Sequence, residues 1–589
     1  MISTLILFFL GMKTANSHGR SSWNPDKQLG KLFMPNCLGK KHPHTLTTQL
    51  NYIVLLIIMK QTRTAFDLLK NMEPLLFSRS FQELYSTSTE RVRRLYLQNI
   101  STFQDTTFAF ALAYPEPEYQ AFAANVLLRW KQVYAEESAF QQREMNLSKD
   151  PDAVKLRERV SVLRAEFSRK IRDPKFQNDI AEVWQNLAMT ENEIREKAKK
   201  VKPKLEVSDA SLDQIAGFLP KDSALIEFLV FYPRDFKTGE GEEPHFAAYL
   251  LLSDIEAERQ TAFEDLGEVE GFVKALEDSE KKPEKQYEYL FGKFDSRINN
   301  LKKLYISPDG NLSLISFASL RLPDGKYLVQ RQEVAQIQTG RDFIPSAKKS
   351  PSPSNLLIAI GGVDYGDLPT GQSEQKADKD APKRLNLRAA DELKDGIDYL
   401  ENSHYEAASI AEYFKAYVKD GKAIVYKKGD ATEKMLKNLE QPPRILHLST
   451  HGFYLQNVDL KEWNEEAPLL LSGLALAGAN QGLQGILDDN GDDGLLYSME
   501  VTGLNLQGTE LVSLSACDTG KGVVDYSEGV YGLVRAFRTA GAQNVLMTLW
   551  PVGDESSTAF MVRFYELWLG GWEENRNPTP SEALAPHTS

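Results

Sequence analysis

Two residues with reactive side chains stand at the ends of two similar, largely apolar segments. The segment Leu511–Ser515 is followed by Cys517, and the segment 444–450 is followed by His451 and Gly452. Apolar runs of this length that end in polar residues and glycine are typical of buried strands. A cysteine nucleophile requires a neighbouring base that stabilises its thiolate. The sequence therefore predicts a pair in which Cys517 is the nucleophile and His451 is the base.

Further residues near this pair have predicted roles. Gly452 has no side chain, so its backbone N–H, together with that of Cys517, is predicted to bind the oxyanion of a tetrahedral intermediate. Asp518 and Asp554 are candidates for a specificity pocket that binds a basic side chain before the scissile bond. Asp518 has an alternative role, which is to cap the turn or helix that follows it. His447 lies inside its strand, so we expect it to be a hydrogen-bonded core residue.

Other roles for Cys517 stay open on the sequence alone. A lone cysteine at a strand end is often a small buried hydrophobic residue. A redox-sensing thiol is less favoured, because the other cysteine, Cys37, lies far away in the chain. Two cysteines among 589 residues form no disulfide framework and favour a reducing, cytoplasmic location. We expect no cofactor and no metal site, since cysteines are scarce and the eight histidines are scattered.

Composition and charge restrict the class of protein. The chain is 42% hydrophobic and 26% charged, as in ordinary globular proteins. A net charge of −13 argues against general binding of nucleic acid, which requires a basic excess. The apolar run 52–59 is shorter than the roughly 20 residues needed to cross a bilayer. We therefore expect no membrane span and interpret this run as a buried helix or strand.

The chain divides into four predicted regions. Residues 1–60 are predicted to be a poorly ordered leader, in which 5–10 resembles the core of a signal peptide without a preceding positive charge. Residues 61–202 show helical spacing of apolar residues and are predicted to be all-α, with a helical hairpin in 153–200. They lack a clear tetratricopeptide pattern, although degenerate helical repeats remain an option. Residues 203–300 predict a β-hairpin, formed by 224–232 and 245–253, and then a helical stretch over 254–300.

The fourth region, 301–589, alternates between strands and helices. Continuous apolar strands that alternate with helices predict a mostly parallel sheet with helices on both faces. In such sheets catalytic groups gather at the carboxyl ends of the strands. The acidic segment 477–494 is predicted to be a solvated loop. The predicted strands are 356–360, 423–426, 445–447, 511–515 and 544–547, and the predicted helices are 406–417, 432–439, 529–540 and 555–569.

A series of motifs in this region resembles the CHAT domain family, over roughly residues 200–572. The motifs follow one another in the family's order: His447–Gly452, Leu514–Gly520, Gly529–Arg538, Ala540–Ala542, Leu549–Asp554 and Phe564–Tyr565. The family is caspase-like and related to separase, and it typically follows tetratricopeptide helices. The resemblance implies an α/β protein whose C-terminal half is a caspase-like, mostly parallel sheet flanked by helices, preceded by an all-α helical region.

The resemblance also implies a function and two alternatives. It implies a cysteine endopeptidase that acts on protein substrates through a dyad at His451 and Cys517. A regulatory protein partner would bind the helical region, and cleavage in the polar segment 366–384 would be a route to activation. Because the family continues past the helix at 580–584 into another strand, we expect a truncated C-terminus here. The alternative function is a catalytically weak or inactive scaffold for protein–protein interaction.

Overall fold

The computed structural model describes most of the chain and divides it into two compact units. The described residues are 43–85, 90–133, 136, 139, 142–143, 146, 150–170, 177–198, 210–237, 241–253, 261–277, 282–344, 354–367, 396–454, 469, 471–515, 523–525, 529–549, 552–573 and 579–584. Unit 1 comprises Met1–Trp130, Val207–Asn300 and Thr339–Ile344, and unit 2 comprises Lys131–Glu206, Leu301–Gln338 and Pro345–Ser589. Among the helices of the described part, none is long and apolar enough to cross a membrane.

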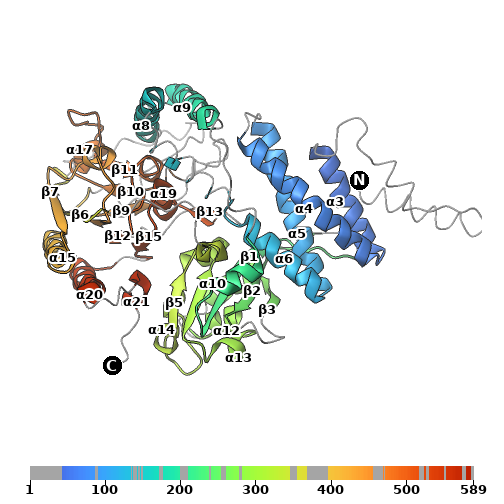
Figure 1. Ribbon diagram of the computed structural model, residues 1–589. Helices are drawn as coiled ribbons and strands as arrows, with labels where there is room; N and C mark the ends of the chain where they lie inside the picture. Colours follow the sequence, from blue (N-terminus) through green and yellow to red (C-terminus); the bar gives the residue numbers. More distant parts are fainter. Residues whose placement is uncertain are drawn as a thin grey trace, which may run out of the picture. The chain divides into compact units, whose positions relative to one another are not determined.

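Unit 1 begins with packed helices. These are α3 (Pro43–Ile58), α4 (Thr62–Tyr85), α5 (Glu90–Ala113) and α6 (Pro117–Trp130), which lie side by side in Figure 1. The prediction of a helical region is confirmed. The apolar run 52–58 belongs to α3, and Ile53, Val54 and Leu56 in it are almost fully buried. The expectation of a buried helix or strand there is confirmed, and α3 lies inside the segment that was predicted to be a leader.

In the described residues, the second part of unit 1 contains three strands, which pair antiparallel, and several short helices. Its elements are α10 (Leu212–Phe218), β1 (Ser223–Phe231), β2 (His245–Leu252), β3 (Thr261–Glu268), α11 (Val269–Glu277), α12 (Lys285–Phe291), α13 (Asp295–Ile298) and η7 (Gly340–Phe343). The predicted hairpin is confirmed, because β1 pairs antiparallel with β2. The prediction of helix throughout 254–300 is wrong for β3, which pairs antiparallel with β2. Glu264 and Asp265 give β3 little strand character in sequence, so pairing with the buried β2 decides its conformation.

Unit 2 is built on a parallel sheet of five strands in the order β15-β12-β8-β6-β7. Every neighbouring pair in this sheet is parallel. Its strands are β6 (Leu356–Val363), β7 (Lys422–Lys428), β8 (Ile445–Ser449), β12 (Leu511–Ser515) and β15 (Asn544–Met547). Each contains a strand predicted from an apolar run. The predicted fold class is therefore confirmed: the protein is α/β, with a helical N-terminal region and a mostly parallel sheet in its C-terminal half.

Helices cover both faces of this sheet (Figure 1). One face packs on α15 (Ser403–Tyr417), α20 (Asp554–Glu573) and α21 (Pro580–Leu584), and the fully buried Trp568 lies in this layer. On the other face, α18 (Ser498–Val501) and α19 (Leu533–Ala540) share a core with the strands, and α8 (Pro151–Lys170) and α9 (Gln177–Ala198) extend that core through α18. In the central strands β6, β8 and β12, alternate residues face opposite layers, which is why these strands are buried along their whole length.

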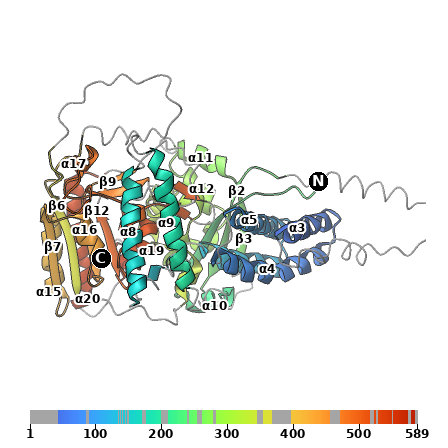
Figure 2. The ribbon, with the colours of Figure 1, turned by 90° about the horizontal axis from the view of Figure 1, so that it is seen from above.

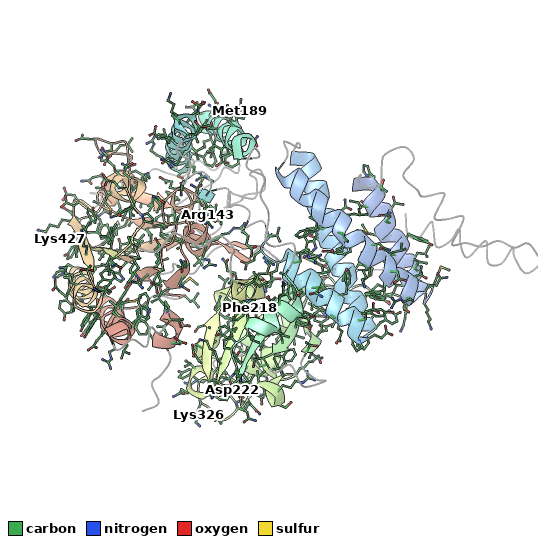
Figure 3. All side chains as sticks on the ribbon, in the orientation of Figure 1. Arg143, Met189, Phe218, Asp222, Lys326 and Lys427 are labelled. Atoms are coloured by element: carbon green, nitrogen blue, oxygen red, sulfur yellow. The ribbon has the colours of Figure 1, made fainter. Side chains whose placement is uncertain are left out.

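The helical hairpin predicted within 153–200 is confirmed as α8 and α9, which run next to each other in Figure 2. Although it lies in the predicted helical region, this hairpin belongs to unit 2, where α8 packs on α18. Phe167 of α8 and Leu187 of α9 are buried in the same core as Leu446 and Val512 of the strands. On the outer side of α9, Met189 is 63% exposed and is labelled in Figure 3.

Smaller elements complete unit 2. They are β4 (Lys303–Ser307), η5 (Gly310–Leu314), η6 (Phe317–Ser319), α14 (Leu328–Arg331), β5 (Glu333–Gln336), α16 (Glu433–Lys437), β9 (Gly452–Tyr454), β10 (Ser472–Ala475), α17 (Ala479–Leu483), β11 (Leu495–Tyr497), β13 (Val523–Asp525) and β14 (Gly529–Tyr531). Strands β9, β10 and β11 form an antiparallel sheet in the order β11-β10-β9. Strand β9 of this sheet begins at Gly452, the residue that follows His451.

Two further predictions are wrong in part. The helix predicted over 529–540 begins only at Leu533, because 529–531 pairs with β13 as β14 and Gly532 keeps an extended backbone. The acidic segment 477–494 is not only a solvated loop, since 479–483 forms α17. In addition, the backbone N–H groups of Asp493 and Gly494 donate to Oε1 of the buried Glu433. The conformation of both segments depends on partners that lie far away in the sequence, and local composition does not reveal these partners.

Candidate active site

The two segments that carry the predicted dyad end side by side. Strands β8 and β12 are parallel neighbours, and Ser449 and Ser515 form their last pair. His451 follows Ser449 by two residues, and Cys517 follows Ser515 by the same number. Cys517 and the neighbouring Asp518 lie outside the described residues. The structure thus places His451 beyond the end of a strand whose neighbour leads to Cys517.

His451 is half-buried and hydrogen-bonded in a way that fixes its protonation pattern. Its Nε2 lies 2.9 Å from the carbonyl oxygen of Asp398. A carbonyl oxygen only accepts hydrogen bonds, so Nε2 carries the proton and donates it. In the neutral ring the lone pair is then on Nδ1. Burial lowers the pKa of His451 below its ordinary value, and the negative charges of Asp398 and Asp554 oppose this only partly. The ring is therefore neutral near pH 7, as a general base must be.

Tyr365 packs against the imidazole. The two rings are in an edge-to-face arrangement, with ring centres 5.5 Å apart and planes at 65°. The Tyr365 hydroxyl lies 2.9 Å from Thr450 Oγ1, which itself donates to the carbonyl oxygen of Ala475 at 2.5 Å. Burial raises the pKa of Tyr365 to about 12, so it stays a neutral phenol. Its ring limits how far the imidazole of His451 can tilt.

The backbone around His451 is held by β10. The N–H of Ala475 donates to the carbonyl oxygen of His451 at 2.8 Å. Gly452 begins β9 and pairs with Leu474 of β10. The backbone of His451 and Gly452 is therefore ordered by a second sheet, independently of the contacts of the imidazole.

Asp554 begins α20 and is half-buried. Its Oδ2 accepts hydrogen bonds from the backbone N–H of Asn402 at 2.7 Å and from Asn402 Nδ2 at 3.0 Å. Its negative charge raises the pKa of His451 and so opposes the effect of burial. Asn402 lies just before α15, and no sequence motif indicated its role.

His447 is fully buried beneath the site, which confirms the prediction of a hydrogen-bonded core residue. Its Nε2 lies 2.9 Å from Oε1 of Glu406, and Oε2 of Glu406 accepts a hydrogen bond from Thr558 Oγ1 at 3.0 Å. Glu406 is in the first turn of α15 and Thr558 is the fifth residue of α20. This network therefore joins the beginnings of both helices to β8. Sequence spacing could not predict it, because its members are far apart in the chain.

A protein-family model for the CHAT domain matches residues 284–587, slightly more than half of the chain. The chain belongs to the CHAT domain family. The match includes all five strands of the parallel sheet and His451. It begins after α8 and α9, although these helices share a core with the strands of the CHAT sheet. A search among curated proteins gives no match to this chain.

Proposed function

We propose that this CHAT protein is a caspase-like cysteine endopeptidase in which Cys517 is the nucleophile and His451 is the general base. The observation that carries this proposal is the state of His451. It is a neutral imidazole with its Nε2 proton engaged by a carbonyl, and it lies at the end of the strand next to the one that leads to Cys517. Family membership supports the same reaction class.

The reaction proceeds by acyl transfer. Nδ1 of His451 takes the proton from the Cys517 thiol, and the sulfur forms a bond to the carbonyl carbon of the scissile peptide. The C–N bond then breaks, and the leaving amine takes the proton from Nδ1. A water molecule attacks the thioester, with His451 again taking a proton, and the C–S bond breaks to release the acid and the thiol. In each half of the reaction the N–H groups of Gly452 and Cys517 stabilise the oxyanion.

We propose a protein substrate with a basic side chain before the scissile bond. Asp554 supports this proposal because only one of its oxygens, Oδ2, is held by Asn402. Among the described residues, no hydrogen bond engages Oδ1. The carboxylate is thus oriented and can still bind a guanidinium or ammonium group. Asp518 would line the same pocket.

Regulation would come through the helical region. We propose that a protein partner binds there, and α8 and α9 support this, since their apolar side chains belong to the same core as the strands that lead to the dyad. A reducing compartment such as the cytoplasm would keep the Cys517 thiol reactive. Cleavage in the segment 366–384 remains a candidate for activation.

A thiol-reactive probe tests the dyad. The full chain carrying Cys37→Ser is treated with iodoacetamide and with a peptide acyloxymethyl ketone that has a basic residue at its reactive end. We expect labelling at Cys517 that disappears in Cys517→Ala. At about pH 6, labelling should be on the order of 100-fold slower in His451→Ala, because an unpaired thiol with a pKa of about 8.5 is almost fully protonated there.

The matched control is Gln507→Ala, which removes a buried amide whose Nε2 donates to the carbonyl oxygen of Ala540 near the opposite end of the sheet. This variant should label like the parent. Labelling that does not depend on His451 would refute the dyad and leave the scaffold as the better function. If iodoacetamide labels in a His451-dependent manner and the basic peptide probe does not, the dyad stands and the basic specificity is wrong.

A further inference from the structure

The carbonyl that orients His451 belongs to a segment without regular secondary structure. Residues 396–400 form neither helix nor strand, and Asp398 is exposed, yet its carbonyl oxygen accepts the hydrogen bond from His451. A carbonyl on a free segment would not hold an imidazole in one orientation. The position of residues 397–402 must therefore be fixed by other contacts.

Asn480, the second residue of α17, holds the beginning of this segment. It is fully buried, and its Oδ1 accepts a hydrogen bond from the N–H of Ile397 at 2.8 Å. Its Nδ2 donates to the carbonyl oxygens of Ile397 and Gly366, both at 3.0 Å. The three hydrogen bonds use both N–H donors and one lone pair of the acceptor oxygen of this side-chain amide.

The same residue also holds the segment on the other side of the imidazole. The backbone N–H of Asn480 donates to the carbonyl oxygen of Tyr365 at 2.8 Å. Two residues earlier, the N–H of Gly478 donates to the carbonyl oxygen of Asp364 at 3.1 Å. Tyr365 is the residue whose ring packs on His451. Asn480 thus connects both neighbours of the imidazole, the Asp398 carbonyl and the Tyr365 ring.

Asn402 holds the other end of the 397–402 segment. Its backbone N–H and its Nδ2 both donate to Oδ2 of Asp554. The adjacent Ser403 is buried and donates from Oγ to the carbonyl oxygen of Leu400 at 2.9 Å. The segment is therefore fixed on both sides of Asp398, by α17 at one end and by the start of α20 at the other.

We propose that Asn480 and Asn402 are positioning residues that fix the Asp398 carbonyl and thereby the Nε2–H tautomer of His451. Without this carbonyl the proton is free to occupy Nδ1, which then has no lone pair to accept the thiol proton. The catalytic meaning of this role rests on the proposed function. The tautomer itself is a property of the folded chain and is measurable without any substrate.

Nuclear magnetic resonance of the full chain, prepared with isotope-labelled histidine, reads the tautomer from the chemical shifts of the two ring nitrogens. The signals of His451 are assigned by comparison with His451→Gln. We expect the parent protein to show Nε2–H and a pKa below the ordinary value for histidine. Asn480→Asp keeps the acceptor and loses both donors, and Asn402→Ala loses one of two donors at a half-buried position. Both should shift the tautomer toward a mixture.

The same variants are compared for alkylation of Cys517 in the Cys37→Ser background. We expect a rate about tenfold lower in Asn480→Asp, because a misoriented base is a poor base. Gln507→Ala should change neither the tautomer nor the alkylation rate, since it also loses a buried amide but lies far from the imidazole along the sheet.

The outcomes separate this proposal from the proposed function. If Asn480→Asp and Asn402→Ala are folded and keep the parent tautomer, the positioning role is wrong. If the tautomer shifts in these variants while alkylation never depends on His451, the positioning role stands and the dyad fails. If Asn480→Asp does not fold, Asn402→Ala decides: an unchanged tautomer overturns the proposal and a shifted one supports it.

Discussion

Replacing Lys437 with methionine removes the cation that pairs with three carboxylates, those of Glu433, Asp492 and Glu500. Its Nζ lies 2.8 Å from Glu433 Oε2, 2.8 Å from Glu500 Oε2 and 3.0 Å from Asp492 Oδ1. The Lys437 side chain is only 13% exposed, so solvent cannot replace it as a partner. Removing one partner of a buried ion pair costs about 3–5 kcal/mol, because the remaining charge is left buried and unpaired.

The pH dependence of this cost follows from Glu433. Burial, together with repulsion from Glu500, raises the pKa of Glu433 to about 7. In the unfolded chain the same group ionises near its ordinary value of 4.5. As pH rises between these two values, the unfolded chain releases the proton first, so this group lowers the stability of the folded protein. Above the folded pKa, Glu433 is ionised and needs Lys437. Lys437→Met should therefore cost most near pH 8 and less than half as much near pH 5, where Glu433 is already protonated.

Hydrogen exchange measured by mass spectrometry is the assay, because it reports local stability without requiring two-state unfolding of the whole chain. Near pH 8, a loss of about 3 kcal/mol should lower protection in 433–437 and 488–501 by on the order of 100-fold. Lys415→Met is the matched control, since its ion pair with Glu412 is exposed and such pairs contribute little. Protection in Lys437→Met that equals the parent, or a loss that does not depend on pH, would refute the reasoning.

Three further predictions concern the surroundings of the site. Glu406→Ala leaves two buried side chains without their acceptor and should destabilise unit 2 by about 2–5 kcal/mol in denaturant titrations, whereas Glu406→Gln should lose clearly less. Gly361→Ala places a Cβ 2.1 Å from the carbonyl oxygen of Ser403, so thermal unfolding should occur at lower temperature and proteolysis near the start of α15 should be faster. Asp398→Ala keeps the backbone carbonyl and should preserve the tautomer of His451. The pKa of His451 should fall, because a nearby negative charge is lost.

The sequence predicted the central strands of the parallel sheet well because they are buried on both faces. Leu511–Ser515 has the predicted bounds and is buried along its whole length, as a continuous apolar run between two layers requires. Asn544–Met547 also has the predicted bounds, although this strand lies at the edge of the sheet and is only partly buried. The prediction of β3 failed for the opposite reason. Its Glu264 and Asp265 are half-buried polar residues, and the strand exists because β2 supplies its hydrogen bonds.

The candidate site was predictable only where residue type carries the chemistry. His451 and Asp554 could be named because an imidazole and a carboxylate are recognisable in a sequence. The acceptor that decides the tautomer of His451 is a backbone carbonyl, which every residue has, so no residue type at position 398 could indicate it. Asn480 was missed because its three hydrogen bonds go to the backbone of segments that lie far away in the chain.

Stability and catalytic geometry thus depend on different contacts in the same sheet. Apolar side chains of alternate strand residues bury the sheet between two helical layers, and this burial tolerates small shifts, since dispersion and hydrophobic contacts have no preferred direction. The end of the sheet near His451 is held by directional hydrogen bonds from Asn480, Asn402 and Ala475, which weaken steeply when their geometry changes. A substitution in the apolar layers should therefore lower the stability of the fold before it changes the tautomer of His451. Loss of the side-chain amide of Asn480 or Asn402 should change that tautomer in a chain that is still folded.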